Sequence, residues 1–99
     1  PTFGPSTFAA NLMRFEACDR FDRKQSCSSQ ANMAHYLAAK ASWEAAEACL
    51  QTHGGFGFST EYDVERKFRE TRVHQVAPIS TNMILSFVGE HVLGMPRSF

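Results

Sequence analysis

A long stretch of small apolar residues, from Ser29 to about Thr52, limits what this chain can fold into. Its apolar residues recur at spacings of three and four, the period of one face of an α-helix. These residues are Ala34, Leu37, Ala38, Ala41, Ala45, Ala48 and Cys49. Because most of them are alanines, another helix can approach this face closely. The pattern predicts a long helix, with Ser28 or Ser29 capping its start.

A glycine pair, Gly54-Gly55, follows this stretch and opens the segment "HGGFGF". One glycine in the left-handed conformation is enough to end a helix, with the aromatic residues packed under a neighbouring helix. Three glycines in four positions also leave backbone bare, so that another molecule can come close. Exposed amides can bind phosphate oxygens. The negative partial charge of a helix C-terminus, however, favours a dinucleotide lying across the loop over an isolated phosphate.

Helical patterns also occur upstream of this stretch. The segment "PSTFAANLMRFEACDRF" places Phe8, Leu12 and Phe15 on one helical face, with Ser6 or Thr7 as a possible cap. The following segment, "FDRKQSCSS", reads as a short polar connection.

Two more helices are predicted downstream. "DVERKFRETRVHQVA" begins at Asp63 and stops before Pro78, which disfavours helix at the residue that precedes it. "STNMILSFVGEHVLG" has Ser80 as its cap and ends at Gly94 and Pro96. Its apolar side consists of Met83, Ile84, Phe87, Val88 and His91. No strand pattern competes, and the connections are short. We therefore expect an all-α, antiparallel bundle of about four helices.

Charge and hydropathy exclude several partners. Ten basic and ten acidic residues cancel, so we expect no attraction to nucleic acid or to an anionic membrane. No apolar run approaches the roughly 18 residues needed to span a bilayer. Cys18, Cys27 and Cys49 are odd in number and lack metal-ligand spacing, which favours reduced thiols in an intracellular protein. The chain starts at Pro1, directly before a helix, as expected for a piece of a longer protein.

A dense run of charges lies between Glu61 and Arg72. The i,i+4 spacing predicts ion pairs along one helix. The predicted pairs are Asp63–Lys67, Glu65–Arg69 and Arg66–Glu70. A solvated helix face is the favoured interpretation. The alternative is a subunit or domain interface built by Arg66, Lys67, Arg69 and Arg72.

The four histidines, His35, His53, His74 and His91, show no spacing typical of a metal site, so we expect no bound metal. Trp43 is expected to pack in the core or in an interface. The polar residues Ser80, Thr81 and Asn82 stand beside the free N–H groups of a helix start. They make either an anion site or an ordinary N-cap, and physics alone favours neither.

Together, "QTHGGFGF", "EYDVERKFRETR", "QVAPISTN" and "GEHVLGMPRSF" resemble the C-terminal helical domain of the acyl-CoA dehydrogenases. The resemblance extends back through "ANMAHYLAAKASWEAAEACL" and covers about residues 28–99. In that family this domain follows an N-terminal helical domain and a central β-domain. The resemblance thus implies that residues 1–99 are one helical domain, lacking those two domains and the first helix of the bundle.

The resemblance also implies a cofactor, FAD. In the family, the segment that matches Gln51, Thr52, His53, Gly54 and Gly55 contacts the FAD of the neighbouring subunit. A short polar stretch that touches FAD matches Ser80, Thr81 and Asn82. A homodimer or homotetramer and an acyl-CoA substrate are therefore expected, in the bacterial cytoplasm or in the mitochondrial matrix.

The sequence departs from the family at the catalytic base. Many members carry a glutamate that removes the α-proton of the acyl thioester, and Pro78 occupies that position here. Ile79 replaces the adjacent glycine and is the candidate substrate contact. We expect no catalytic residue in this chain and a base upstream of Pro1, as in some members. If no upstream glutamate exists, His74 is the first residue to test.

Three alternatives remain open beside the dehydrogenase. An acyl-CoA oxidase or a flavin monooxygenase would share the fold. A non-catalytic helical module for oligomerisation or partner binding would share the helical pattern without the flavin chemistry.

Overall fold

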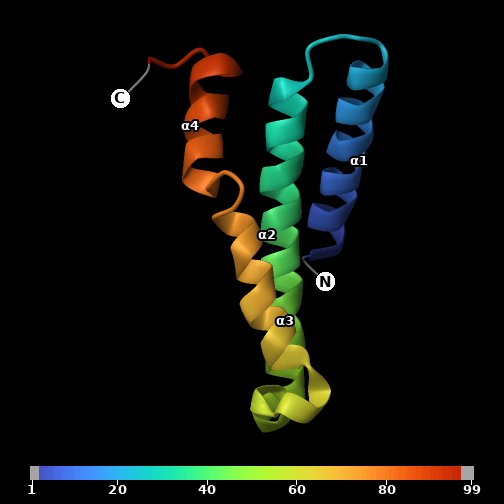
Figure 1. Ribbon diagram of the computed structural model, residues 1–99, viewed down its shortest axis with the longest axis vertical. Helices are drawn as coiled ribbons and strands as arrows, with labels where there is room; N and C mark the ends of the chain where they lie inside the picture. Colours follow the sequence, from blue (N-terminus) through green and yellow to red (C-terminus); the bar gives the residue numbers. More distant parts are fainter. Residues whose placement is uncertain (1–2, 97–99) are drawn as a thin grey trace.

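The computed structural model describes residues 3–96, and these form four α-helices with three short 3₁₀ segments. Helix α1 (Phe3–Asp22) and helix α2 (Ser28–His53) make an antiparallel hairpin (Figure 1). Segments η1 (Gly54–Phe58) and η2 (Thr60–Tyr62) turn the chain at the far end of α2. The described residues contain no strand, so the all-α prediction is confirmed.

The second half of the chain returns along α2. Helix α3 (Val64–Thr71) and segment η3 (Arg72–Gln75) lie beside the C-terminal half of α2, and α4 (Thr81–His91) lies beside its N-terminal half (Figure 1). In that view α1 stands on the other side of α2 from α4. The described part of the molecule measures 46 × 32 × 23 Å, with α2 at its centre.

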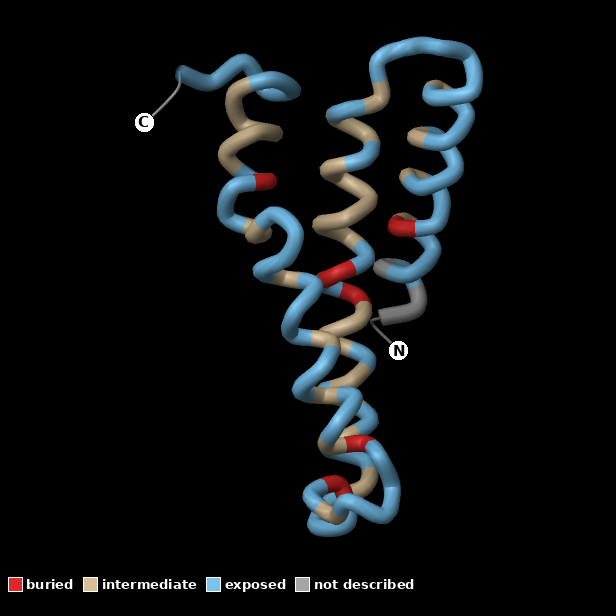
Figure 2. Tube along the Cα trace, viewed as in Figure 1, coloured by how far each residue is buried: buried red, intermediate tan, exposed pale blue. Residues whose placement is uncertain are grey.

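Helix α2 is buried at two narrow stripes of small residues on different sides of the helix. Its fully buried residues are Ala39 and Ala41, seen in red near its middle in Figure 2. Residues two positions apart on a helix point about 200° apart around its axis, so these two alanines face different neighbouring elements. Ala39 lines a hollow together with His74 of η3, whereas Ala41 belongs to the predicted apolar face. The predicted face is therefore only part of the buried surface of α2.

The exposure of the remaining predicted positions agrees with this correction. Ala38, Ala45 and Cys49 are exposed, although all three belong to the predicted face. A helix packed between two neighbours needs two stripes of small residues, and the predicted face includes Ala41 but not Ala39.

Helix α1 turns its predicted apolar face outward. Phe8, Leu12 and Phe15 are 66%, 56% and 62% exposed, whereas Ala10 is buried. The small side chain of Ala10 allows close approach to α2, and partly buried Met13 borders it. The face that carries Phe8, Leu12 and Phe15 is therefore not the one that packs against α2.

The predicted helix starts are partly correct. Helix α1 is already formed at Phe3, upstream of Ser6 and Thr7, so neither residue is its cap. Cys27 precedes α2 without a side-chain cap hydrogen bond, so the prediction of Ser28 or Ser29 as cap is wrong. Asp63 precedes α3 as predicted.

The predicted helix ends are close to the observed ones. Helix α3 ends at Thr71 and tightens into η3 before Pro78. The last helix ends at His91, and Gly94, with φ +72°, follows within the closing turn. Among residues 3–96, no helix combines the length and apolar character needed to cross a bilayer.

Candidate functional site

The last turn of α2 folds its polar side chains back onto its own backbone. Thr52 Oγ1 donates to the carbonyl oxygen of Ala48 (2.8 Å), and His53 Nδ1 donates to that of Cys49 (2.9 Å). Gln51 is exposed, and its carbonyl oxygen accepts the N–H of Gly54. The side chains of Thr52 and His53 are thus hydrogen-bonded to the backbone of α2. Backbone without side chains begins only at the glycines that follow.

The three glycines of the loop have three different environments. Gly54 has φ +60°, a conformation that side chains resist. Gly57 is buried, and a Cβ there would stand 2.9 Å from the carbonyl oxygen of Leu50. Gly55 has no positive φ, and a Cβ there would meet no described atom within 4 Å. Helix α2 ends at the glycine pair as expected. Gly54 has a positive φ, but its ψ of −133° lies outside the left-handed helical region, and Gly55 has no positive φ, so the expected left-handed cap is wrong.

The aromatic residues of the loop face outward. Phe56 is 68% exposed and Phe58 77% exposed, so neither is packed under a neighbouring helix. The edge of Phe56 meets Tyr62, with ring centroids 5.9 Å apart, and the His53 ring lies 6.0 Å from the same tyrosine. An exposed aromatic cluster therefore surrounds the bare glycine backbone.

The start of α4 is the second predicted site. Ser80 Oγ accepts the backbone N–H of Met83 (3.3 Å), which confirms Ser80 as the cap. The N–H groups of Thr81 and Asn82 have no acceptor among the described residues. They point out of the helix start, where the dipole favours negative charge. Both the cap and the potential for anion binding are therefore present.

The structure does not bring the two predicted segments together. Thr81 lines the same groove as Lys40 and Glu47, whereas Gln51 lies in the last turn of α2, and Figure 1 shows the start of α4 well away from the glycine loop. Pro78 and Ile79 are exposed beside the start of α4. The two segments could therefore contact two ends of one extended ligand, or two different ligands.

A groove of about 430 Å³, which the sequence analysis did not predict, is lined by Thr81 at the start of α4 and by residues of α2 and η3. Trp43 forms part of its wall, with Phe68 stacked at 4.6 Å and the Arg72 guanidinium 4.9 Å from its ring centre. Trp43 is therefore half-buried in a groove wall and not in the core, and its role in an interface stays a prediction. The groove also carries Lys40, Glu44 and Glu47, so its fixed charges balance. Its two walls come from segments about thirty residues apart in sequence, which no local pattern relates.

The charged helix α3 forms ion pairs with itself. Two of the predicted pairs are present, Glu65–Arg69 at 2.8 Å and Arg66–Glu70 at 3.2 Å. Lys67 reaches Glu70 (3.8 Å) instead of the predicted Asp63. The hydrogen bond from Arg69 to Glu65, together with the charge of that carboxylate, raises the pKa of Arg69 above its usual range.

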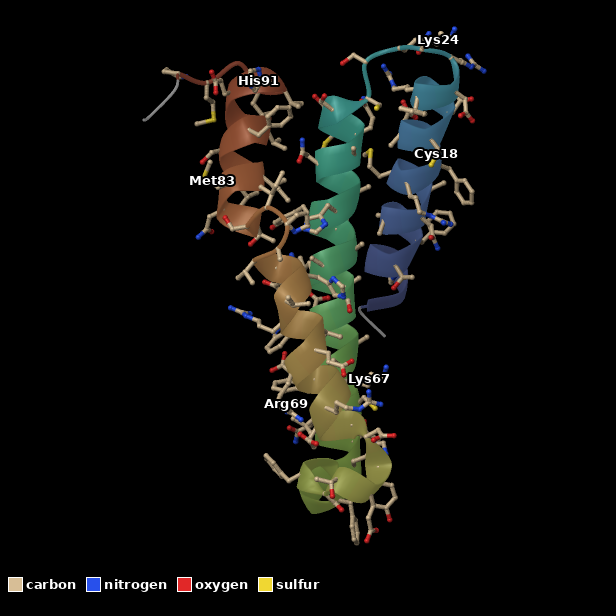
Figure 3. The ribbon with its side chains drawn as sticks, in the orientation of Figure 1. Cys18, Lys24, Lys67, Arg69, Met83 and His91 are labelled. Atoms are coloured by element: carbon tan, nitrogen blue, oxygen red, sulfur yellow. The ribbon has the colours of Figure 1, made fainter. Side chains whose placement is uncertain are left out.

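These ion pairs lie on the surface. Figure 3 shows Lys67 and Arg69 on α3, on the part of the molecule above the glycine loop. In this single chain the charged side of α3 is therefore a solvated helix face. The alternative, a subunit interface built by the same residues, stays a prediction.

Comparison with known proteins identifies the domain. The family model described as "Acyl-CoA dehydrogenase, C-terminal domain" matches residues 7–93, which extends the resemblance upstream into α1. The chain is 39% identical over 92 residues to the acyl-CoA dehydrogenase FadE12 of Mycobacterium tuberculosis, covering 91% of this chain and 24% of that protein.

Two further relatives are more distant. The chain is 35% identical to the caffeyl-CoA reductase-Etf complex subunit CarC of Acetobacterium woodii, covering 69% of this chain and 18% of that one. It is 30% identical to an acyl-CoA dehydrogenase of Bacillus subtilis, covering 87% and 23%. The chain thus spans a quarter or less of the length of these relatives. It belongs to the acyl-CoA dehydrogenase family and matches the C-terminal domain of that family.

Proposed function

We propose that this chain is the C-terminal domain of a flavin-dependent acyl-CoA dehydrogenase, which oxidises an acyl-CoA thioester to the 2,3-enoyl-CoA. Its part in that enzyme is to contact FAD across a subunit interface. Family membership supports the reaction class. The cofactor contacts rest on the geometry of the glycine loop.

The observation that carries the proposal is Gly55. Gly54 needs a positive φ, and Gly57 needs the absence of a Cβ, so the fold accounts for both glycines. Nothing in the described structure requires a glycine at position 55, which is exposed with open space around its missing Cβ. A ligand that lies against this backbone accounts for it. The exposed loop therefore fits a dinucleotide cofactor.

Two groups of residues would hold FAD. Gln51, Thr52 and His53, with the two glycines after them, would contact its adenosine diphosphate part from one subunit. Ser80, Thr81 and Asn82 would present N–H groups at the start of α4 to an electronegative part of the cofactor. The two groups lie at different places along α2, which suits contacts that belong to two subunits. FAD, when bound, accepts the hydride that leaves the substrate.

The proton acceptor lies outside this chain in the proposal. Pro78, at the position of the family glutamate, has no side-chain group that takes up a proton. We therefore expect Pro78→Glu in the longer enzyme not to raise acyl-CoA-dependent flavin reduction. A large gain in turnover from Pro78→Glu would show that the enzyme lacks a base elsewhere.

The experiment that tests the cofactor contacts is Gly55→Val in the longer enzyme. The open space around Gly55 admits the side chain without disturbing the fold, so the variant should remain folded. We expect it to lose FAD and subunit association together. The matched control is Thr60→Val, which places the same side chain at an exposed position of η2, outside the proposed contact.

Flavin absorbance after gel filtration, together with the elution volume, reads out both properties. Retention of flavin and of quaternary structure in Gly55→Val would place the cofactor elsewhere. We also expect the 99-residue chain alone to be colourless after gel filtration, because the flavin ring would bind mainly to the absent β-domain.

A second candidate is the reverse reaction, reduction of an α,β-unsaturated acyl group. It is favoured by the relative CarC, which is named as a caffeyl-CoA reductase subunit. Assaying the longer enzyme with saturated acyl-CoA plus an oxidant, and with enoyl-CoA plus a reductant, distinguishes the two directions.

A further inference from the structure

A hollow of about 220 Å³ lies between α2 and η3. Its described lining residues are His35, Ala38, Ala39, Ser42 and His74. The first four share one face of α2, at spacings of three and four, and His74 comes from η3. Because Arg72 and Gln75 of the same segment line the larger groove, η3 separates the two spaces. No predicted flavin contact lines this hollow.

His35 carries an unsatisfied polar atom. Its Nε2 is buried and has no hydrogen-bond partner among the described residues. Buried polar atoms without partners are rare in folded proteins, because the group has lost its hydrogen bonds to water. The His35 ring lines the hollow, but Nε2 itself is covered, so a partner in the hollow would reach this atom after the ring turns. At roughly 30 Å³ per water molecule, the hollow could hold a small molecule together with a few waters.

The polar groups around this space are all able to donate hydrogen bonds. They are the two imidazoles and the hydroxyl of Ser42, and no carboxylate is among the described lining residues. The charged groups on the neighbouring elements are engaged elsewhere. Lys40 and Arg72 line the groove beyond η3, and Arg14 of α1 lies over the Phe15 ring at 4.5 Å.

We propose that His35, Ser42 and His74 form a binding site for a small oxyanion, either a carboxylate or a phosphate. Imidazole N–H and hydroxyl groups both donate hydrogen bonds to such oxygens. A metal ion is the weaker alternative, because residues 3–96 contain no group of three metal-ligating side chains. The site is independent of the proposed flavin contacts.

The test is an NMR titration of the 99-residue chain, observing the ring protons of all four histidines. Inorganic phosphate and acetate are added separately, at pH 6 and at pH 8. We expect saturable shifts of His35 and His74, with His53 and His91 unchanged. Saturation by phosphate alone or by acetate alone identifies which oxyanion the site takes.

Two variants keep the proposal open to refutation. His74 is exposed, so His74→Gln should fold normally and weaken binding about tenfold or more. Ser42→Ala is the second variant, with a smaller expected loss, and His91→Gln on α4 is the matched control with no loss. Shifts that grow linearly without saturating, or that affect all four histidines alike, overturn the site. Binding unchanged in both His74→Gln and Ser42→Ala also overturns it.

Discussion

The three loop glycines offer a sharp test of the fold, because the same substitution should have three different effects. In Gly57→Ala the new Cβ would lie 2.8 Å from Leu50 Cδ1 and 2.9 Å from the Leu50 carbonyl oxygen. The side-chain atom can move, but the backbone oxygen belongs to the last turns of α2. The loop must therefore shift away from the helix that it closes.

The expected magnitudes follow from these environments. Overpacking of this kind costs about 1–3 kcal/mol of unfolding free energy, which we expect for Gly57→Ala. Gly54→Ala should cost about 1–2 kcal/mol, because alanine resists the positive φ at that position. Gly55→Ala should be neutral, or stabilising by up to about 1 kcal/mol, because it restricts the unfolded chain and meets no folded neighbour.

Urea unfolding followed by helical circular dichroism measures this ranking. With a slope of about 2 kcal/mol per M, a loss of about 2 kcal/mol lowers the midpoint by about 1 M. Gly55→Ala serves as the matched control in the same loop. Equal midpoints for Gly55→Ala and Gly57→Ala would show that the loop does not pack on Leu50, and the argument that assigns Gly55 to a ligand would fail with it.

Three further predictions concern stability and association. Ser80→Ala removes the cap hydrogen bond to Met83 and should cost about 0.5–2 kcal/mol in urea unfolding, whereas the exposed Asn82→Ala should cost less. Ile84→Ala, at a side chain only 1% exposed, should cost about 2–5 kcal/mol, and half-exposed Leu85→Ala distinctly less, by thermal unfolding. The isolated chain should self-associate through its exposed apolar surface, and Phe15→Glu should shift light scattering toward the monomer. A wild-type chain that is monomeric at high concentration contradicts the last prediction.

The sequence predicted helices well because their signals are local. The end of α2 at Gly54, the start of α3 after Asp63 and the Ser80 cap each depend on a few adjacent residues. Burial was predicted poorly. Phe8 is as hydrophobic as any core residue, yet the small side chain of Ala10 determines which face of α1 meets α2. Hydrophobic periodicity shows that a helix has an apolar side, but the shape of the neighbour decides which side is covered.

The candidate site divides in the same way. The glycine loop and the start of α4 were visible as short motifs, and the structure gives each a distinct geometry. The groove beside Trp43 and the hollow beside His35 were not visible, because each combines α2 with residues of η3 about thirty positions away. His74 entered the sequence analysis only as an isolated histidine, and its neighbour across the hollow comes from the fold.

The uninterrupted course of α2 has a mechanical consequence. Its 26 residues contain neither glycine nor proline, and they extend about 39 Å at the rise of an α-helix. Such a helix moves as a rigid rod, because it has no residue at which a sharp kink usually forms. A tilt of about 5° at the glycine loop would displace the opposite end by about 3 Å. A displacement at the loop would then be transmitted to the contact between α2 and α4.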